Sequence, residues 1–212
     1  FFSTPPPPTP ILSGLVGSEM CIRDRVHSWG KNPIQTIPLN VGYVATYASK
    51  YLSKDNIDCS FTLFKDPTKM IEAIKRDKPN VVGLSYYMWN MELNRRVFDV
   101  VKEYVPNSLK IGGGPCFTKQ NANEKDAKLF FSRHNNCDAF VVNQGEKGFV
   151  ELIKTFYEVG SDLKKFREIA IPGSLINDLK NPSRYMKIDL LSSGPLREKC
   201  LDKSKVLGLL IR

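Results

Sequence analysis

Three strand-like segments, each ending at a small or polar residue, constrain the fold of this chain more than any other feature. They are VVGLS at 81–85, KIGGGP at 110–115 and AFVVNQGE at 139–146. In an open α/β sheet, ligands bind outside the carboxyl ends of the strands, where the strand order reverses. The three strand ends therefore predict a single binding crevice in which the backbone comes close to a ligand.

Strand and helix periodicities alternate along the chain around these segments. Helices are expected over 38–52, 66–78, 91–105, 123–133 and 146–160, and strands over 59–64, 80–87, 109–115 and 137–143. Strands that alternate with helices of this length are typical of βαβ units, which have right-handed crossovers. The expected fold class is α/β: a Rossmann-like, doubly wound parallel sheet of about five strands with helices on both faces.

Local signals mark the helix ends and the end of the domain. Asp66 is expected to cap a helix that has Pro67 at its first position, and Gly160 is a natural stop for the last helix. After Gly160 the sequence becomes rich in Pro, Ser and Asn and loses its periodicity. The predicted domain spans 26–160, and residues 161–212 are interpreted as a linker with one short strand over Ile171–Leu175.

Residues 1–25 are interpreted as standing outside the domain. Four consecutive prolines exclude a helix or a central strand, and SGLVGSEMCIRDR resembles a translated sequencing adapter. We therefore interpret this segment as an assembly artefact; the alternative is a disordered Pro-rich arm. If the segment is foreign, the first strand of the sheet, expected upstream of His27, is missing.

Composition narrows the classes of partner. The net charge is +9, but more than half of this excess lies in residues 161–212, so a basic nucleic-acid-binding face is not predicted. The sequence contains no run of about 18 apolar residues, so a membrane span is not predicted. The five cysteines form no CxxC pair, which argues against a zinc ribbon and favours a reducing, cytoplasmic compartment.

The glycine run and its neighbours are the candidate ligand contacts. Gly112–Gly114 permit a close approach of the backbone to a ligand, but the segment matches neither GxGxxG nor GxxxxGK[ST]. Ser85 ends its strand with a hydroxyl that either contacts a ligand or is satisfied locally. The aromatic residues that begin at Tyr86 either wall a large planar ligand or cover the sheet. Glu146 is either a ligand contact or an ordinary residue of a helix N-terminus.

No catalytic residue and no metal ligand is predicted. His27 lies in HSWG, which imitates part of the cobalt-ligating motif DxHxxG. The position that this motif reserves for Asp is Arg25, however. His27 is therefore not expected to bind a metal.

Taken together, four segments resemble the cobalamin-binding domain of radical S-adenosylmethionine enzymes, over about residues 33–157. They are PLNVGYVATYASKYL, DKPNVVGLSYYMWN, IGGGP and DAFVVNQGEKGFVELI. The resemblance implies a Rossmann-like domain that holds cobalamin at the strand ends, often without a protein histidine on cobalt. The positions that it assigns to the cofactor are Pro38, Leu39, Ser85, Gly112, Gly113, Gly114, Pro115, Gly145 and Glu146. Tyr86 is added to them as the first of the aromatic residues.

The same resemblance implies a second domain. A family member continues into a barrel with a CxxxCxxC motif, whose thiolates hold a [4Fe–4S] cluster that cleaves S-adenosylmethionine. No CxxxCxxC occurs in these 212 residues. The prediction is a cobalamin-binding module without its own catalytic centre, whose partner is a missing C-terminal radical domain, in a parent enzyme of methyltransferase or related type. A nucleotide-sugar or dinucleotide-binding domain of a transferase, and an interaction module with an empty crevice, stay open as alternatives.

Overall fold

Helices and strands alternate along the described part of the chain, as expected. The computed structural model describes residues 13–16, 39–64, 66–88, 90–117, 123–142 and 145–178, with the backbone alone at 13–16, 39 and 40. The helices are α2 (Leu39–Leu52), η1 (Ser53–Asp55), α3 (Pro67–Asp77), α4 (Met91–Tyr104), α5 (Glu124–Arg133), α6 (Gly145–Glu158) and α7 (Leu163–Arg167). The strands are β1 (Ser13–Val16), β2 (Phe61–Phe64), β3 (Val81–Ser85), β4 (Leu109–Gly113), β5 (Ala139–Val141) and β6 (Ser174–Ile176).

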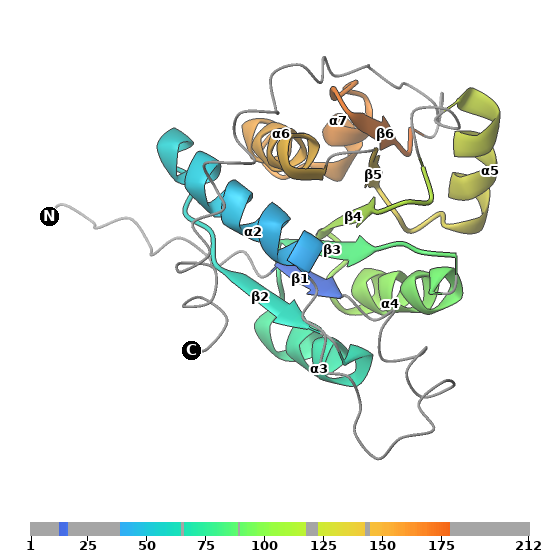
Figure 1. Ribbon diagram of the computed structural model, residues 1–212, viewed down its shortest axis with the longest axis horizontal. Helices are drawn as coiled ribbons and strands as arrows, with labels where there is room; N and C mark the ends of the chain where they lie inside the picture. Colours follow the sequence, from blue (N-terminus) through green and yellow to red (C-terminus); the bar gives the residue numbers. More distant parts are fainter. Residues whose placement is uncertain are drawn as a thin grey trace, which may run out of the picture.

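These strands form one sheet in the order β2-β1-β3-β4-β5-β6 (Figure 1). All neighbouring pairs are parallel except β5 and β6, which are antiparallel. The strand order reverses between β1 and β3, which is the switch point of a doubly wound sheet. The predicted α/β fold class is confirmed.

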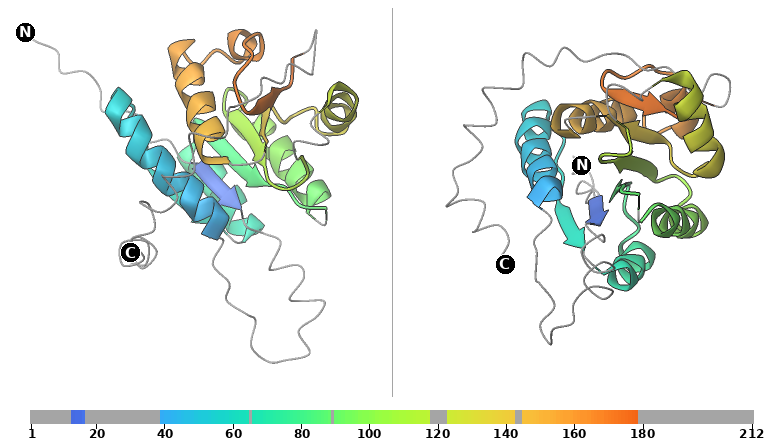
Figure 2. Two further views of the ribbon diagram at one scale, coloured as in Figure 1. Left: turned by 45° about the horizontal axis from the view of Figure 1, so that its top comes forward. Right: turned by 45° about the vertical axis from the view of Figure 1, so that its right-hand side comes forward.

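Helices cover both faces of the sheet (Figure 1 and Figure 2). On one face, apolar side chains of α3, α4 and α5 pack around Phe98, Phe130 and Phe140. On the other face, α2, α6 and α7 pack around Leu52, Phe156 and Phe166. None of the described helices has the length and apolar character needed to cross a bilayer.

The predicted helix ends are confirmed where the sequence carried a local signal. The Asp66 carboxylate accepts a hydrogen bond from the Thr68 N–H at 2.8 Å, with Pro67 as the first residue of α3. Gly160 takes a left-handed φ of 69° after α6. These positions depend on neighbouring backbone atoms alone, which is why the sequence predicts them.

The structure differs from the expectation for residues 1–25, because Ser13–Val16 forms β1 between β2 and β3. β1 pairs with β2 from Ser13↔Phe61 to Val16↔Phe64, but with β3 only at Val16↔Leu84. The backbone N–H and C=O groups of β2 and β3 that face each other across the space between these strands need hydrogen-bond partners. Ser13–Val16 contains no proline and pairs with both strands, so it supplies partners for those groups. The four prolines lie outside the described residues.

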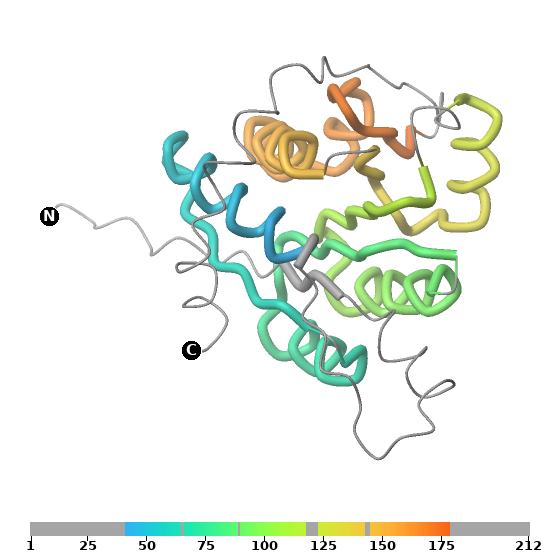
Figure 3. The backbone as a smooth tube through the Cα atoms, in the orientation of Figure 1, coloured from blue at the N-terminus to red at the C-terminus, as the bar shows by residue number. Residues whose placement is uncertain are grey.

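The fold also continues beyond Gly160, where the sequence predicted a linker. Figure 3 shows the chain passing from α6 through α7 to β6, which lies beside β5. The predicted strand over 171–175 is present as β6, shifted to Ser174–Ile176. Phe166 and Leu175 are fully buried, so these elements belong to the domain. Residues 179–212 of the expected linker lie outside the described residues.

A buried group of charges holds this extension to the sheet. Lys110 Nζ lies 2.9 Å from Asp138 Oδ2 and donates to the Ser108 carbonyl at 2.7 Å. Arg167 Nε of α7 donates to Asp138 Oδ1 at 3.1 Å. The side chain of Asp138 is 0% exposed and that of Lys110 is 3% exposed. Breaking such a pair leaves an uncompensated buried charge, which is strongly destabilising.

We therefore expect Asp138→Asn to lower the free energy of unfolding by about 3–5 kcal/mol, measured by urea denaturation. Glu124→Gln is the matched control, because it removes the partner of Lys128 from an exposed pair on α5. Its effect is expected to stay below about 1 kcal/mol. Equal losses of unfolding free energy in the two variants would contradict the stabilising role of the buried charges.

His134 is the one histidine within the described residues, and it lies in the aromatic core. Its ring stacks on Phe130 at 4.5 Å and meets the edge of Tyr86 at 5.4 Å. Its Nδ1 atom is buried without a hydrogen-bond partner. Burial, with a smaller contribution from the Arg95 guanidinium, lowers the pKa of His134 below its ordinary value of 6.5.

This lowered pKa predicts a pH dependence of stability. Above pH 6.5 the histidine is neutral in both states, and below it the unfolded chain takes up the proton first. Stability is therefore expected to fall as the pH drops from about 6.5 towards the folded-state pKa. Urea midpoints of the wild type and His134→Phe, compared between about pH 5 and 8, test this. A wild-type curve parallel to that of the variant would contradict it.

Candidate functional site

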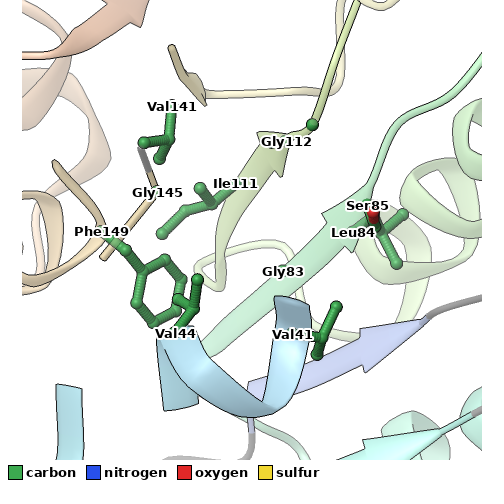
Figure 4. A pocket seen from close by; sticks show the side chains of 12 residues that line it. Val41, Val44, Gly83, Leu84, Ser85, Ile111, Gly112, Val141, Gly145 and Phe149 are labelled. Atoms are coloured by element: carbon green, nitrogen blue, oxygen red, sulfur yellow. The ribbon is translucent and has the colours of Figure 1, made fainter. Parts of the chain in front are cut away.

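A pocket of about 130 Å³ lies at the carboxyl ends of β3, β4 and β5, on the face covered by α2 and α6 (Figure 4). Val41 and Val44 of α2 and Phe149 of α6 line its helical side. The pocket is largely apolar, and the Ser85 hydroxyl is the polar side-chain group among its lining residues. The predicted site residues that line it are Ser85, Gly112, Gly113, Gly114 and Gly145.

The three consecutive glycines serve three different purposes. Gly112 faces the opposite side of the sheet, where an added Cβ would lie 2.7 Å from Phe140 Cδ2. Gly114 has a φ of 125°, and its Cβ would lie 2.5 Å from the Tyr86 carbonyl oxygen. At Gly113 the nearest atom to an added Cβ is Val141 Cβ at 3.9 Å. Of these three glycines, Gly113 alone leaves space that a side chain would otherwise fill inside the pocket.

This difference predicts opposite tolerance at adjacent positions. Gly112→Ala is expected to lower the free energy of unfolding by about 1–3 kcal/mol, because the methyl group overpacks the core against Phe140. Gly113→Ala is expected to leave stability unchanged or raise it by about 0.5 kcal/mol, since glycine costs chain entropy in a strand. Urea denaturation of both variants measures this. A larger loss at Gly113 than at Gly112 would contradict the assignment of faces.

Tyr86 lies in the core and not in the pocket. Its side chain is fully buried against Phe98, Phe130 and Phe140, on the face opposite α2 and α6. Burial raises the pKa of its phenol. Its backbone N–H donates to the Gly113 carbonyl at 2.6 Å. For Tyr86, the structure favours the interpretation in which the aromatic residues cover the sheet.

The remaining predicted positions are not among the lining residues. Pro38 lies outside the described residues, and so does His27, which was not expected to bind a metal. Leu39 begins α2 with its side chain undescribed. Pro115 is exposed beyond the glycine turn, and Glu146 lies in the first turn of α6. The contact of Pro38, Leu39, Pro115 and Glu146 with the cofactor stays a prediction.

Two asparagines that the sequence did not single out support the site from behind. Asn90 and Asn94 are buried at the start of α4, and both donate to the Ser85 carbonyl. Within the described ranges, no group of three or more His, Cys, Asp or Glu side chains has an arrangement that could hold a metal ion. The crevice thus presents apolar walls, a glycine backbone that a ligand can approach closely, and the hydroxyl group of Ser85.

The family model described as "B12 binding domain" matches residues 33–153, a range that includes every residue lining the pocket. The chain belongs to the B12-binding domain family. Cobalamin is therefore its cofactor, and the resemblance noted from the sequence is confirmed. Because the chain belongs to this family, the alternative interpretation as a nucleotide-sugar or dinucleotide-binding domain is not supported.

Two curated proteins are similar to the chain. Over 146 residues it is 30% identical to the cobalamin-dependent radical SAM methyltransferase TokK of Streptomyces tokunonensis, covering 66% of this chain and 20% of that protein. Over 134 residues it is 28% identical to the 2-(S-pantetheinyl)-carbapenam-3-carboxylate methyltransferase of Streptantibioticus cattleyicolor. This match covers 61% of this chain and 18% of that protein. The chain thus spans about a fifth of the length of these relatives.

The described crevice fits part of this cofactor. At about 130 Å³ the pocket is far too small to enclose a corrin ring with all its side chains. It lies at the carboxyl edge of the sheet, where a large ligand can rest on the strand ends and insert one group between the helices. The missing side chain at Gly113 and the apolar walls suit an inserted flat group.

Proposed function

We propose that this chain is the cobalamin-binding part of a cobalamin-dependent radical S-adenosylmethionine methyltransferase. The observation that carries the placement of the cofactor is the open position of Gly113, which faces an apolar pocket inside the region that matches the family. The names of both similar proteins support the class of the parent enzyme.

Each lining residue then has a physical task. Gly113 lets part of the cofactor lie directly against the β4 backbone. Val41, Val44 and Phe149 exclude water from that group, and the hydroxyl of Ser85 is a hydrogen-bond donor or acceptor for its polar edge. When bound, cobalamin supplies a cobalt centre that can carry a methyl group.

The catalytic centre is assigned to a second domain. A [4Fe–4S] cluster and S-adenosylmethionine belong to that domain in our proposal, and it is the protein partner of this one. Reading the gene beyond codon 212 tests this assignment, and a CxxxCxxC motif is the expected result. We also assign the protein to a reducing cytoplasmic compartment, which the free thiols of Cys59 and Cys137 support.

Titration of the 212-residue chain with hydroxocobalamin tests the site itself. Binding is expected to shift the visible spectrum of the cofactor, and Gly113→Val is expected to weaken binding by about tenfold or more by filling the pocket. Gly42→Ala is the matched control, because an added Cβ there meets no atom within 4 Å. It should bind as the wild type does.

Two outcomes would contradict this proposal. Absence of any spectral change with the wild-type chain would overturn cobalamin binding by this chain. Binding that Gly113→Val leaves intact would overturn the placement of the cofactor. Nucleotide sugars and dinucleotides, added as competitors, are expected to displace nothing.

A further inference from the structure

The peptide unit between Ser85 and Tyr86 is held at both of its polar ends. On one side the Ser85 carbonyl accepts hydrogen bonds from Asn90 Nδ2 at 2.8 Å and Asn94 Nδ2 at 2.9 Å. On the other side the Tyr86 N–H donates to the Gly113 carbonyl at 2.6 Å. Because a peptide unit is planar, these contacts together determine its orientation where β3 ends.

The direction of the Ser85 side chain is fixed when the peptide units on both sides of its Cα are held, the preceding one within β3 and the following one by Asn90, Asn94 and Gly113. Ser85 is the last residue of β3 and pairs with Gly113, the last residue of β4. Both residues line the pocket. Rotation of the following peptide unit would change the backbone angle ψ of Ser85 and would break the contact with Gly113. The backbone of Ser85 would then be held on its β3 side alone, and its hydroxyl would no longer be kept firmly beside the open position of Gly113.

Apart from its bonds to the Ser85 carbonyl and, at 3.4 Å, to Asn90 Oδ1, the buried amide of Asn94 does nothing visible to stabilise the domain. Its side chain is buried within α4, close in sequence to the core residues Val97 and Phe98, and its Oδ1 atom has no hydrogen-bond partner among the described residues. A buried amide with an unsatisfied atom destabilises a fold, and an apolar side chain suits such a position better. Asn90 differs, because its Oδ1 also accepts from the Tyr87 N–H at 2.8 Å as part of the turn into α4.

We propose that Asn94 is a positioning residue for cobalamin binding, which acts by holding the Ser85 carbonyl so that the Ser85 hydroxyl faces the pocket beside Gly113. This inference rests on the proposed function, since it takes the pocket as the cofactor site. Asn94 itself is not among the lining residues. Its contribution passes through the backbone of Ser85.

The test compares four variants of the full 212-residue chain by hydroxocobalamin titration and thermal unfolding. Asn94→Leu removes the amide but keeps the number and branching of the side-chain heavy atoms, and it is expected to weaken binding by about tenfold. Val97→Ala, one turn further along α4 and facing the same core, is the control for lost stability. It should lower the unfolding temperature while its affinity stays within about twofold of the wild type.

Ser85→Ala and the double variant with Asn94→Leu decide whether Asn94 acts through Ser85. If it does, the double variant binds no more weakly than the weaker single variant, because the two changes remove the same contact. If the losses of binding free energy in the two single variants add up in full in the double variant, the proposal is overturned. Wild-type affinity in Asn94→Leu would overturn it as well, and Asn94→Ala replaces this variant if it does not fold.

The outcome separates this inference from the proposed function. If the wild-type chain binds hydroxocobalamin and Gly113→Val weakens that binding while Asn94→Leu does not, only the role of Asn94 is wrong. If the wild-type chain shows no binding, the proposed function fails and this inference fails with it.

Discussion

Pairing between β3 and β4, from Val81↔Leu109 to Ser85↔Gly113, organises both faces of the domain. Successive residues of a strand point to opposite faces, so a single residue separates a core position from a pocket position. Gly112 makes room for the ring of Phe140 on one face, and Gly113 leaves the pocket open on the other. A shift of this register by one residue would exchange the two roles.

Two groups of buried polar contacts lie at opposite ends of this strand pair. At the amino end, Lys110, Asp138 and Arg167 form a buried charge group that joins α7 to the sheet. At the carboxyl end, the amides of Asn90 and Asn94 hold a single backbone carbonyl. The first arrangement joins the extension to the sheet, and the second holds the backbone beside the pocket that we propose as the cobalamin site.

Close packing of α2 against α6 gives the crevice its helical walls. An added Cβ at Gly145 would lie 3.3 Å from Val44 Cγ2, so the small residue at the start of α6 lets the two helices approach. Phe149, one turn further along, lines the pocket together with Val44 (Figure 4). The pocket is therefore a consequence of helix packing over a strand end that lacks side chains.

The sequence by itself determined the alternation of helices and strands from α2 to α6, the helix ends at Asp66 and Gly160, and the meeting of Ser85 with the glycine run at one crevice. Each of these depends on local periodicity, on a cap, or on the rule that parallel strand ends share an edge. Only the tertiary structure decided that Tyr86 belongs to the core, that Asn94 supports Ser85, and that the fold extends through β6. Those facts depend on which face a side chain meets and on contacts between residues distant in sequence, which no local pattern encodes.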